Sequence, residues 1–199
     1  MHLVQALAIA QVAIFCLAGP PYILDTIHGK TQPERATWFI WTVLGAIAFV
    51  SQVLLGASWS LVFTGLDTLG SLLVFLLSIR FGVGGWTRLD KAALVVAAVG
   101  VCVSLLARQP IIAIVGVIVA DVSGALLTVR KTFLHPGSET TVSWLLIGVG
   151  SLCGVLSVQR LDAALLLYPV YLCIVNWSVP LAQIAGRAYQ RSRRIVPSA

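Results

Sequence analysis

The sequence predicts an all-α membrane protein with seven transmembrane helices in a 3+1+3 arrangement, in which one extra helix joins two parallel three-helix units. Three observations predict this fold class: the composition, the length of the apolar runs and a polar motif that occurs twice. Of the 199 residues, 59% are hydrophobic and only 10% are charged. A soluble domain carries about 25% charged residues, so this chain is too apolar for a single buried core.

Seven apolar runs follow one another along the chain. Most reach the roughly 20 residues that cross about 30 Å of hydrocarbon, and the fourth run is the shortest. The alternating segments of a membrane β-barrel do not occur, so helices are the expected spanning structure. The runs cover residues 3–24, 36–56, 58–79, 91–107, 110–129, 141–158 and 162–186.

These runs divide the chain into four regions. Helices 1 to 3 form a first unit in residues 1–88, and the fourth run is a linker helix in residues 89–108. Helices 5 to 7 form a second unit in residues 109–186, followed by a basic tail, residues 187–199. The first run lacks a basic N-terminal region and is long for a signal peptide, so we expect it to be a retained helix.

The basic residues predict the orientation. Eleven of the 13 lysines and arginines fall on one side of the predicted membrane, and only Arg108 and Arg160 fall on the other. The positive-inside rule then places the N-terminus outside and the C-terminus in the cytosol, which an odd number of helices satisfies. We expect a bacterial cytoplasmic membrane. The formal charge of +6 is a topology signal and does not indicate nucleic-acid binding.

A polar motif occurs twice at matching places. Residues 29–38 read "GKTQPERATW" and residues 130–144 read "RKTFLHPGSETTVSW", and each motif leads into a long apolar run. Three helices are an odd number, so a second unit would be inverted unless the linker helix restored its orientation. Repeated units in transporters place the substrate site near the midplane, where the repeats meet. The matched residues are Lys30 and Lys131, Pro33 and Pro136, Glu34 and Glu139, and Trp38 and Trp144.

The segment "PPYILDTIHGKTQPERATWFIW" is similar to the PQ-loop pattern, which has a proline in helix 1, a basic connection and an aromatic start to helix 2. Together with the 3+1+3 arrangement, the chain resembles the SWEET and SemiSWEET transporters, and it is also similar to small bacterial membrane proteins. The resemblance implies alternating access for a sugar-like solute. The family's Pro-Gln dipeptide is Pro21-Tyr22 here, and of the hinge prolines expected in helices 1, 2, 5 and 6 only Pro20 and Pro21 are present.

Two acids lie deep in apolar runs, Asp67 in "TGLDTLGS" and Asp121 in "VIVADVSG". An aspartate at such depth costs about 2.5–3.5 kcal/mol on insertion scales and is tolerated when it faces a cavity or a partner. We therefore predict that both acids, with Thr64 nearby, bind a solute hydroxyl, an amine or a proton. The alternative is a hydrogen bond that packs two helices. The apolar runs contain no lysine or arginine partner near them, which favours an uncharged or cationic solute.

Helix 7 contains a second polar group, Asn176, Trp177 and Ser178, between Pro169 and Pro180. SWEET proteins use a polar residue in helices 3 and 7 to contact the solute, so the resemblance implies that role for Asp67 and Asn176. A sugar ring could stack on Trp177. The alternatives are an interhelical hydrogen bond for Asn176 and lipid-facing packing for Trp177. The two prolines interrupt backbone hydrogen bonds, which predicts hinges or tolerated kinks.

The acids of the repeated motif, Glu34 and Glu139, are predicted to lie at the cytosolic ends of helices 2 and 6. An acid there suits the positive end of the helix dipole, so capping is one interpretation. The other is an inner gate that opens and closes.

Enzyme chemistry is not expected, because the sequence contains no catalytic or phosphate-binding motif. The four cysteines lie in apolar runs without metal-ligand spacing. We therefore predict no catalytic residues, no metal and no cofactor. The predicted partners are a small-molecule solute, anionic lipid headgroups at the basic tail and a second copy of the chain in a homo-oligomer. The predicted function is a SWEET-like transporter, with or without coupling to protons; the alternative is a non-transporting receptor or assembly partner.

Overall fold

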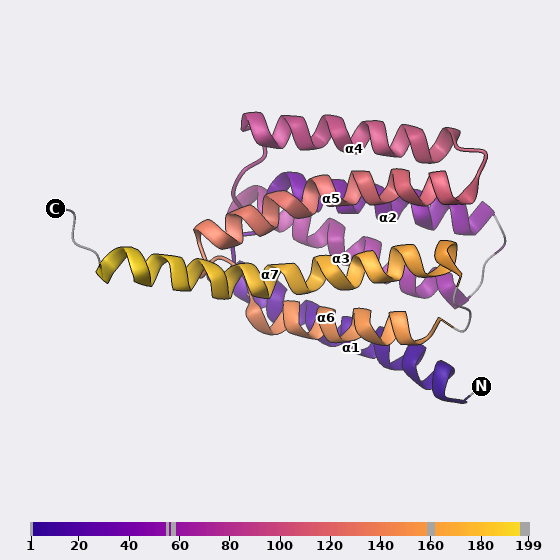
Figure 1. Ribbon diagram of the computed structural model, residues 1–199, viewed down its shortest axis with the longest axis horizontal. Coiled ribbons are helices and arrows are strands. Elements are labelled where there is room, and N and C mark those ends of the chain that lie inside the picture. The colour runs from indigo at the N-terminus through magenta and orange to yellow at the C-terminus, as the bar shows by residue number, and fades with distance from the viewer. Residues whose placement is uncertain (1, 55, 57–58, 159–161, 196–199) are drawn as a thin grey trace.

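The computed structural model describes residues 2–54, 56, 59–158 and 162–195. In these ranges the chain is helical, and the only β-type pairing is an isolated bridge between Glu34 and Val83. Figure 1 shows the helices lying side by side. They are α1 (His2–Ile27), α2 (Arg35–Leu54), α3 (Trp59–Phe81), α4 (Arg88–Leu106), α5 (Pro110–Leu134), α6 (Thr141–Leu156) and α7 (Ala163–Ile195).

Six of the described helices are long and apolar enough to cross a membrane. The exception is α6, whose 16 residues extend about 24 Å at 1.5 Å per residue. The prediction that the fourth run is the shortest is therefore wrong, since α4 has 19 residues. The cause is the start of α4, which begins at Arg88, before the apolar run at 91–107, because Thr87 and Asp90 cap it with reciprocal hydrogen bonds. Large apolar side chains cover the outer surface of the bundle, as expected for contact with lipid.

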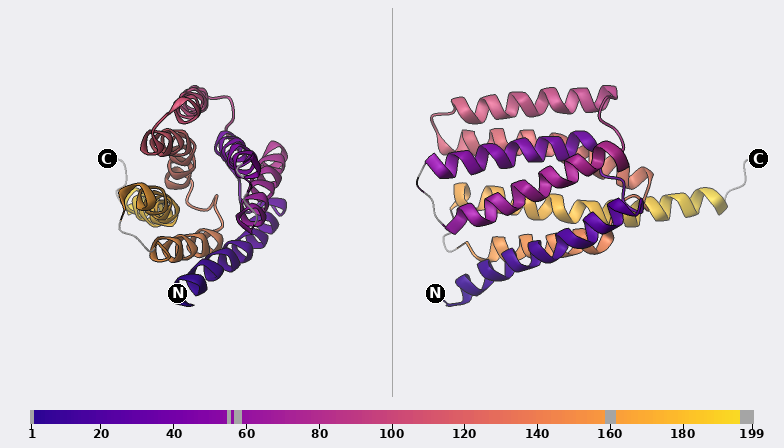
Figure 2. Two further views of the ribbon diagram at one scale, coloured as in Figure 1. Left: turned by 90° about the vertical axis from the view of Figure 1, so that its right-hand side faces the viewer. Right: turned by 180° about the vertical axis from the view of Figure 1, so that it is seen from behind.

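Six of the helices form a closed ring. Going around it, α1 contacts α3, α3 contacts α2, α2 contacts α5, α5 contacts α7, α7 contacts α6, and α6 returns to α1. The left view of Figure 2 looks along this ring and shows α4 on its outside. Among the described helices, α3 contacts only α1 and α2, so α5 and α7 face it from across the ring.

The outer helix α4 packs on α5 through small residues. Gly100 and Gly116 face each other so closely that a Cβ on either one would lie 2.6 Å from the other's carbonyl oxygen. Close backbone approach of this kind is a common way to join helices in lipid, where the hydrophobic effect does not drive their association. Ala93 and Ala97 of α4 are also buried, in a cluster with Ile40 of α2 and Ala120 of α5.

The two ends of the ring are packed differently. One end contains the loops 28–34, 82–87 and 135–140, and we call it the packed end. Small polar side chains there, such as Thr26, Thr37 and Thr132, have no solvent exposure. The opposite end has fewer buried residues. None of the described residues is buried in α1 up to Leu17 or in α2 after Ile40, and the same is true of the halves of α3 and α7 that lie toward this end.

The proline-containing helices run without interruption through their prolines. Pro20 and Pro21 lie inside α1, and Pro169 and Pro180 lie inside α7. Helix α7 also continues past the ring at the packed end, as Figure 1 shows. The basic segment from residue 187 is thus the last part of α7 as far as Ile195, and within it Tyr189 and Gln190 still contact the end of α5.

Candidate functional site

The first part of the site is an acidic centre around Asp67 and Asp121. Asp67 shares a helical stripe with Ser71, Val74 and Ser78, which lie four, seven and eleven residues further along α3 and are all buried. Residues at this spacing lie on one helix face, so Asp67 points into the ring. Protein atoms fill most of the space around the Asp67 carboxyl group. The residue nevertheless keeps solvent-accessible surface. Its accessible surface therefore faces the inside of the ring.

Asp67 and Asp121 interact across the ring. They lie at similar distances from the C-terminal ends of two parallel helices, α3 and α5. The carboxyl group of Asp121 interacts electrostatically with that of Asp67, and Tyr168 on α7 interacts with both. Because α3 contacts neither α5 nor α7, these side chains interact between helices that do not touch each other.

Asp121 is almost completely buried, at 5% exposure, and lacks a firm partner. Its carboxyl group interacts with the indole N–H of Trp41 and the phenol of Tyr171. Neither Trp41 Nε1 nor Tyr171 Oη reaches full hydrogen-bonding geometry with any acceptor, although both atoms are buried. In the part of the chain that the structure describes, the ion pairs are Lys30–Asp25 and Lys131–Glu139. No lysine or arginine there pairs with Asp67 or Asp121.

The other predicted solute-binding residues form bonds within the bundle. Asn176 is buried and donates to Ser151 Oγ of α6 at 2.6 Å. Ser178 donates to the carbonyl oxygen of Val175 in its own helix, and Thr64 donates to Gln52 of α2 at 3.1 Å.

Trp177 packs against α6 at Gly148, where an added Cβ would lie 2.9 Å from the indole ring. The described contacts thus join the polar group of α7 to α6, whereas Asp67 and Asp121 face each other.

Sequence reasoning missed Trp41, Tyr168 and Tyr171. All three lie in apolar runs, where aromatic residues do not stand out. The available signal was the position of Tyr168 and Tyr171 beside Pro169 in helix 7, and in the structure their rings lie 6.1 Å apart.

The second part of the site is a buried polar cluster at the packed end, where the sequence predicts an inner gate, and we refer to this cluster as the gate. It is centred on an ion pair between Lys131 and Glu139, whose side chains are only 8% and 0% exposed. Lys131 Nζ also donates to the carbonyl oxygen of Gln32 at 2.5 Å. The other carboxylate oxygen of Glu139 accepts a hydrogen bond from Trp144 Nε1 at 2.7 Å. Two buried charges are stable only when paired and hydrogen-bonded in this way.

The gate ties together the two loops of the repeated motif. The backbone N–H of Gln32 donates to the carbonyl oxygen of Ser138 at 3.0 Å. The hydroxyls of Thr31 and Thr140 lie 2.5 Å apart, and Thr140 donates to Asp25 at 3.0 Å. The loop after α1 and the loop after α5 thus hold each other shut.

An aromatic cluster connects the gate with the acidic centre. Trp38 packs against Tyr22 at 5.2 Å and against Trp41 at 5.1 Å between ring centroids. Trp41 also packs against Trp144 at 6.1 Å. Trp41 therefore touches Trp144, which binds the gate residue Glu139, and interacts with Asp121 in the centre.

Glu34 behaves differently from Glu139. Its Oε2 accepts hydrogen bonds from the backbone N–H of Thr37 at 2.7 Å and from its hydroxyl at 2.9 Å. This confirms the capping prediction for Glu34, whereas Glu139 pairs with Lys131 instead. Glu34 Oε1 is buried without a partner. Burial raises the pKa of Glu34 against the effect of the Thr37 bonds, and nearby Asp90 raises it further.

The two lysines aligned in the repeated motif occupy different positions. Lys30 lies in the loop after α1, is 75% exposed, and approaches Asp25 only to 3.9 Å. Lys131 lies in the last turn of helix α5. The buried pair therefore exists in the second unit alone.

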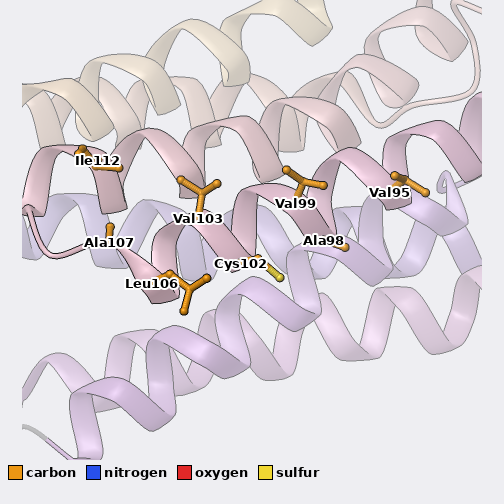
Figure 3. Close-up of a pocket in the computed structure, with 8 residues that line it drawn as sticks. All are labelled: Val95, Ala98, Val99, Cys102, Val103, Leu106, Ala107 and Ile112. Atoms are coloured by element: carbon orange, nitrogen blue, oxygen red, sulfur yellow. The ribbon is translucent and has the colours of Figure 1, made fainter.

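Two grooves on the bundle are apolar. The larger, about 580 Å³, lies along α4 and is lined by aliphatic residues and Cys102, as Figure 3 shows. Val95, Val99 and Leu106 in it are widely exposed, so it belongs to the lipid-facing surface. The other, about 440 Å³ between α5 and α7, is aliphatic except for Tyr171. Neither offers a polar ligand site, and the described residues form no group of three or more potential metal-ligating side chains.

Comparisons with protein-family models, with curated proteins and with solved structures give no match to this chain. What this protein does must therefore be inferred from the acidic centre and the gate.

Proposed function

We propose that this protein is a membrane transporter of SWEET-like architecture that moves a small polar, uncharged or cationic solute by alternating access between two three-helix units. The observation that carries the proposal is Asp67 on α3 facing Asp121 and Tyr168 across a ring of helices. Unpaired acids inside a membrane are costly and usually serve function. Their position in the ring interior is where a solute or a coupled proton would bind.

The pattern of helix contacts supports two equivalent units. Exchanging α1, α2 and α3 with α5, α6 and α7 converts the contact α1–α3 into α5–α7 and α2–α3 into α6–α7. The same exchange converts α1–α6 into α2–α5. The ring contacts are thus unchanged by the exchange, as expected for two parallel units related by an axis along the membrane normal.

The difference between the two ends supports alternating access. By the positive-inside rule the packed end faces the cytosol, and there the ion pair Lys131–Glu139 closes the ring. The halves of α1, α2, α3 and α7 toward the opposite end are less buried, and Asp67 retains accessible surface. This arrangement corresponds to a carrier closed on the inside and accessible from the outside. Opening the gate would require Lys131 and Glu139 to separate.

One observation favours the alternative, a non-transporting membrane protein. Asn176 and Ser178, the polar residues of α7, are engaged in hydrogen bonds within the bundle, as they would be in a structural role. A receptor or assembly partner would also keep the gate permanently closed.

Transport by reconstituted protein tests the proposal. Proteoliposomes are assayed for uptake of radiolabelled glucose and choline, as a neutral and a cationic probe, alongside candidates from mass spectrometry of co-purifying molecules. We expect saturable uptake of at least one probe, and a fall to the level of empty vesicles in Asp121→Asn. The matched control is Asp162→Asn, the same change in the loop before α7. If no probe or co-purifying molecule is taken up by correctly folded protein, the transporter proposal fails.

A second experiment tests the gate. In a protein whose four cysteines are replaced by alanine, Thr128→Cys introduces a thiol at a fully buried position near the packed end. A water-soluble thiol reagent should label it faster when Lys131→Met is added. Equal labelling rates with and without Lys131→Met would mean that the ion pair does not hold the gate closed.

A further inference from the structure

We propose that the acidic centre formed by Asp67 and Asp121 binds an organic cation with a protonated or quaternary amine, and not a neutral sugar. This inference rests on the proposed transport function and narrows the substrate class of the same site. It draws on the charges, the aromatic side chains and the lack of free hydrogen-bonding groups around the centre.

The charges of the centre favour a cation. Two carboxyl groups face each other across the ring, and in the described ranges neither has an ion-pair partner. The nearest buried lysine, Lys131, is already bound to Glu139 and to Gln32. Attraction between opposite charges is strongest where water is scarce. A positive group held between the two acids would therefore be bound tightly, whereas an anion would be repelled.

Aromatic side chains lie close to the same acids. Tyr168 interacts with both acids, and Tyr171 and Trp41 interact with Asp121. Rings of Trp and Tyr attract cations to their faces, and several rings around one point form the usual cage for a quaternary ammonium group. The rings of Tyr168 and Tyr171 also pack against each other, with centroids 6.1 Å apart, so a methylated amine bound at the acids would have aromatic neighbours. A bare metal ion would gain little from these rings, because hard cations prefer oxygen ligands.

The centre is poor in groups that could bind a sugar. A sugar needs several free donors and acceptors around its hydroxyls, because each unpaired polar group left in a dry site costs binding free energy. The hydroxyl of Ser123 donates to a carbonyl of its own helix, as does that of Ser178, and the amide of Asn176 is bonded to Ser151. Among the described donors that interact with Asp121, Trp41 Nε1 and Tyr171 Oη are buried without a hydrogen-bond partner. These two suit the positioning of one carboxylate, Asp121, beside a cation.

Equilibrium binding distinguishes the solute classes. Purified protein in nanodiscs is titrated with radiolabelled choline, and glucose, succinate and sodium are added as competitors. We expect saturable choline binding that glucose and succinate do not displace and that sodium displaces only weakly. Losing one charge of a desolvated pair should weaken choline binding about 30-fold or more in Asp121→Asn and in Asp67→Asn. Tyr168→Leu should weaken it about fivefold through loss of a ring. Asp162→Asn should have no effect.

The outcomes separate this inference from the transporter proposal. If glucose binds and is transported while choline does neither, the inference is overturned and transport stands. If choline binds in an aspartate-dependent way but no vesicle uptake occurs, the inference holds and the transporter proposal fails. Sodium competing as strongly as choline would contradict the role of the rings. Thermal unfolding of each variant confirms that it is folded, which Asp→Asn changes should not impair because they remove a buried charge.

Discussion

The acidic centre and the gate both place charged side chains inside a membrane-type helix bundle, but the charges have different partners. At the gate, Lys131 and Glu139 bind each other, and the remaining oxygen of Glu139 is bound by Trp144. In the centre, Asp67 and Asp121 face each other with no ion pair. A satisfied pair stabilises one conformation, whereas unsatisfied acids destabilise the empty protein and favour a ligand that neutralises them. Removing a charge should therefore lower the free energy of unfolding at the gate and raise it in the acidic centre.

The largest effect is expected from breaking the gate pair. Lys131→Met leaves Glu139 buried without its counter-charge and should lower the free energy of unfolding by about 3–5 kcal/mol. The measurement is unfolding of the protein in nanodiscs or mild detergent, followed by tryptophan fluorescence. The double variant Lys131→Met/Glu139→Gln should recover most of the loss, because no unpaired charge remains.

The aligned lysine Lys30 provides the matched control for this change. Its side chain is 75% exposed and lies 3.9 Å from Asp25, and such surface pairs contribute about 0–1 kcal/mol. Lys30→Met should therefore leave stability nearly unchanged. If Lys30→Met and Lys131→Met lowered the free energy of unfolding equally, the buried ion pair would contribute no more to stability than the exposed one.

This contrast also marks the limit of the sequence analysis. The existence and order of seven helices followed from the apolar runs, because lipid requires the backbone to be bonded within each helix. The pairing of Lys131 with Glu139 did not follow. Aligning Lys30 with Lys131 by their neighbours in sequence treated a loop residue and a helix residue as equivalent, and only the end of α5 at Leu134 reveals the difference.

The acidic centre was partly predictable. Asp67 and Asp121 stand out because an acid deep in an apolar run has few structural uses. Trp41, Tyr168 and Tyr171 do not stand out, because aromatic residues in membrane helices also pack against lipid and neighbouring helices. Which rings face the acids depends on helix rotation, which the pattern of apolar residues leaves open in a helix that is apolar on all sides.

A smaller loss is expected at the point where the aromatic cluster meets the gate. Trp144→Phe keeps most of the ring packing but removes the 2.7 Å hydrogen bond to Glu139. Hydrogen bonds to charged groups contribute about 1.5–3 kcal/mol, so stability should fall by about that amount. Trp38→Phe is the control, because the Trp38 indole nitrogen is buried without a hydrogen-bond partner. Losing an unpaired N–H should cost less, and a larger loss in Trp38→Phe would show that ring packing dominates.

Removing a charge from the acidic centre should increase the stability of the protein, in contrast to the gate. Asp121→Asn replaces a buried, unpaired carboxyl group with a neutral amide of the same shape, so the free energy of unfolding of the empty protein should rise by about 1–3 kcal/mol. The same unfolding assay measures it. A loss of stability in Asp121→Asn would indicate that the carboxylate is bonded within the bundle, as in the alternative of a helix-packing role.

The smallest effect is expected for Glu34. One of its carboxylate oxygens is hydrogen-bonded, as in Glu139, and the other is buried without a partner. Its folded pKa is raised above 4.5, chiefly by burial. The folded state therefore binds the proton more tightly than the unfolded state, and stability should fall as pH rises from about 4.5 through the folded pKa. Glu34→Gln should retain the cap to Thr37 and reduce this fall. The test compares melting temperatures of both proteins at several pH values between 4 and 8. Because Lys131 and Asp90 also act on Glu34, parallel pH profiles for the two proteins would assign the dependence to another group and leave Glu34 as a cap alone.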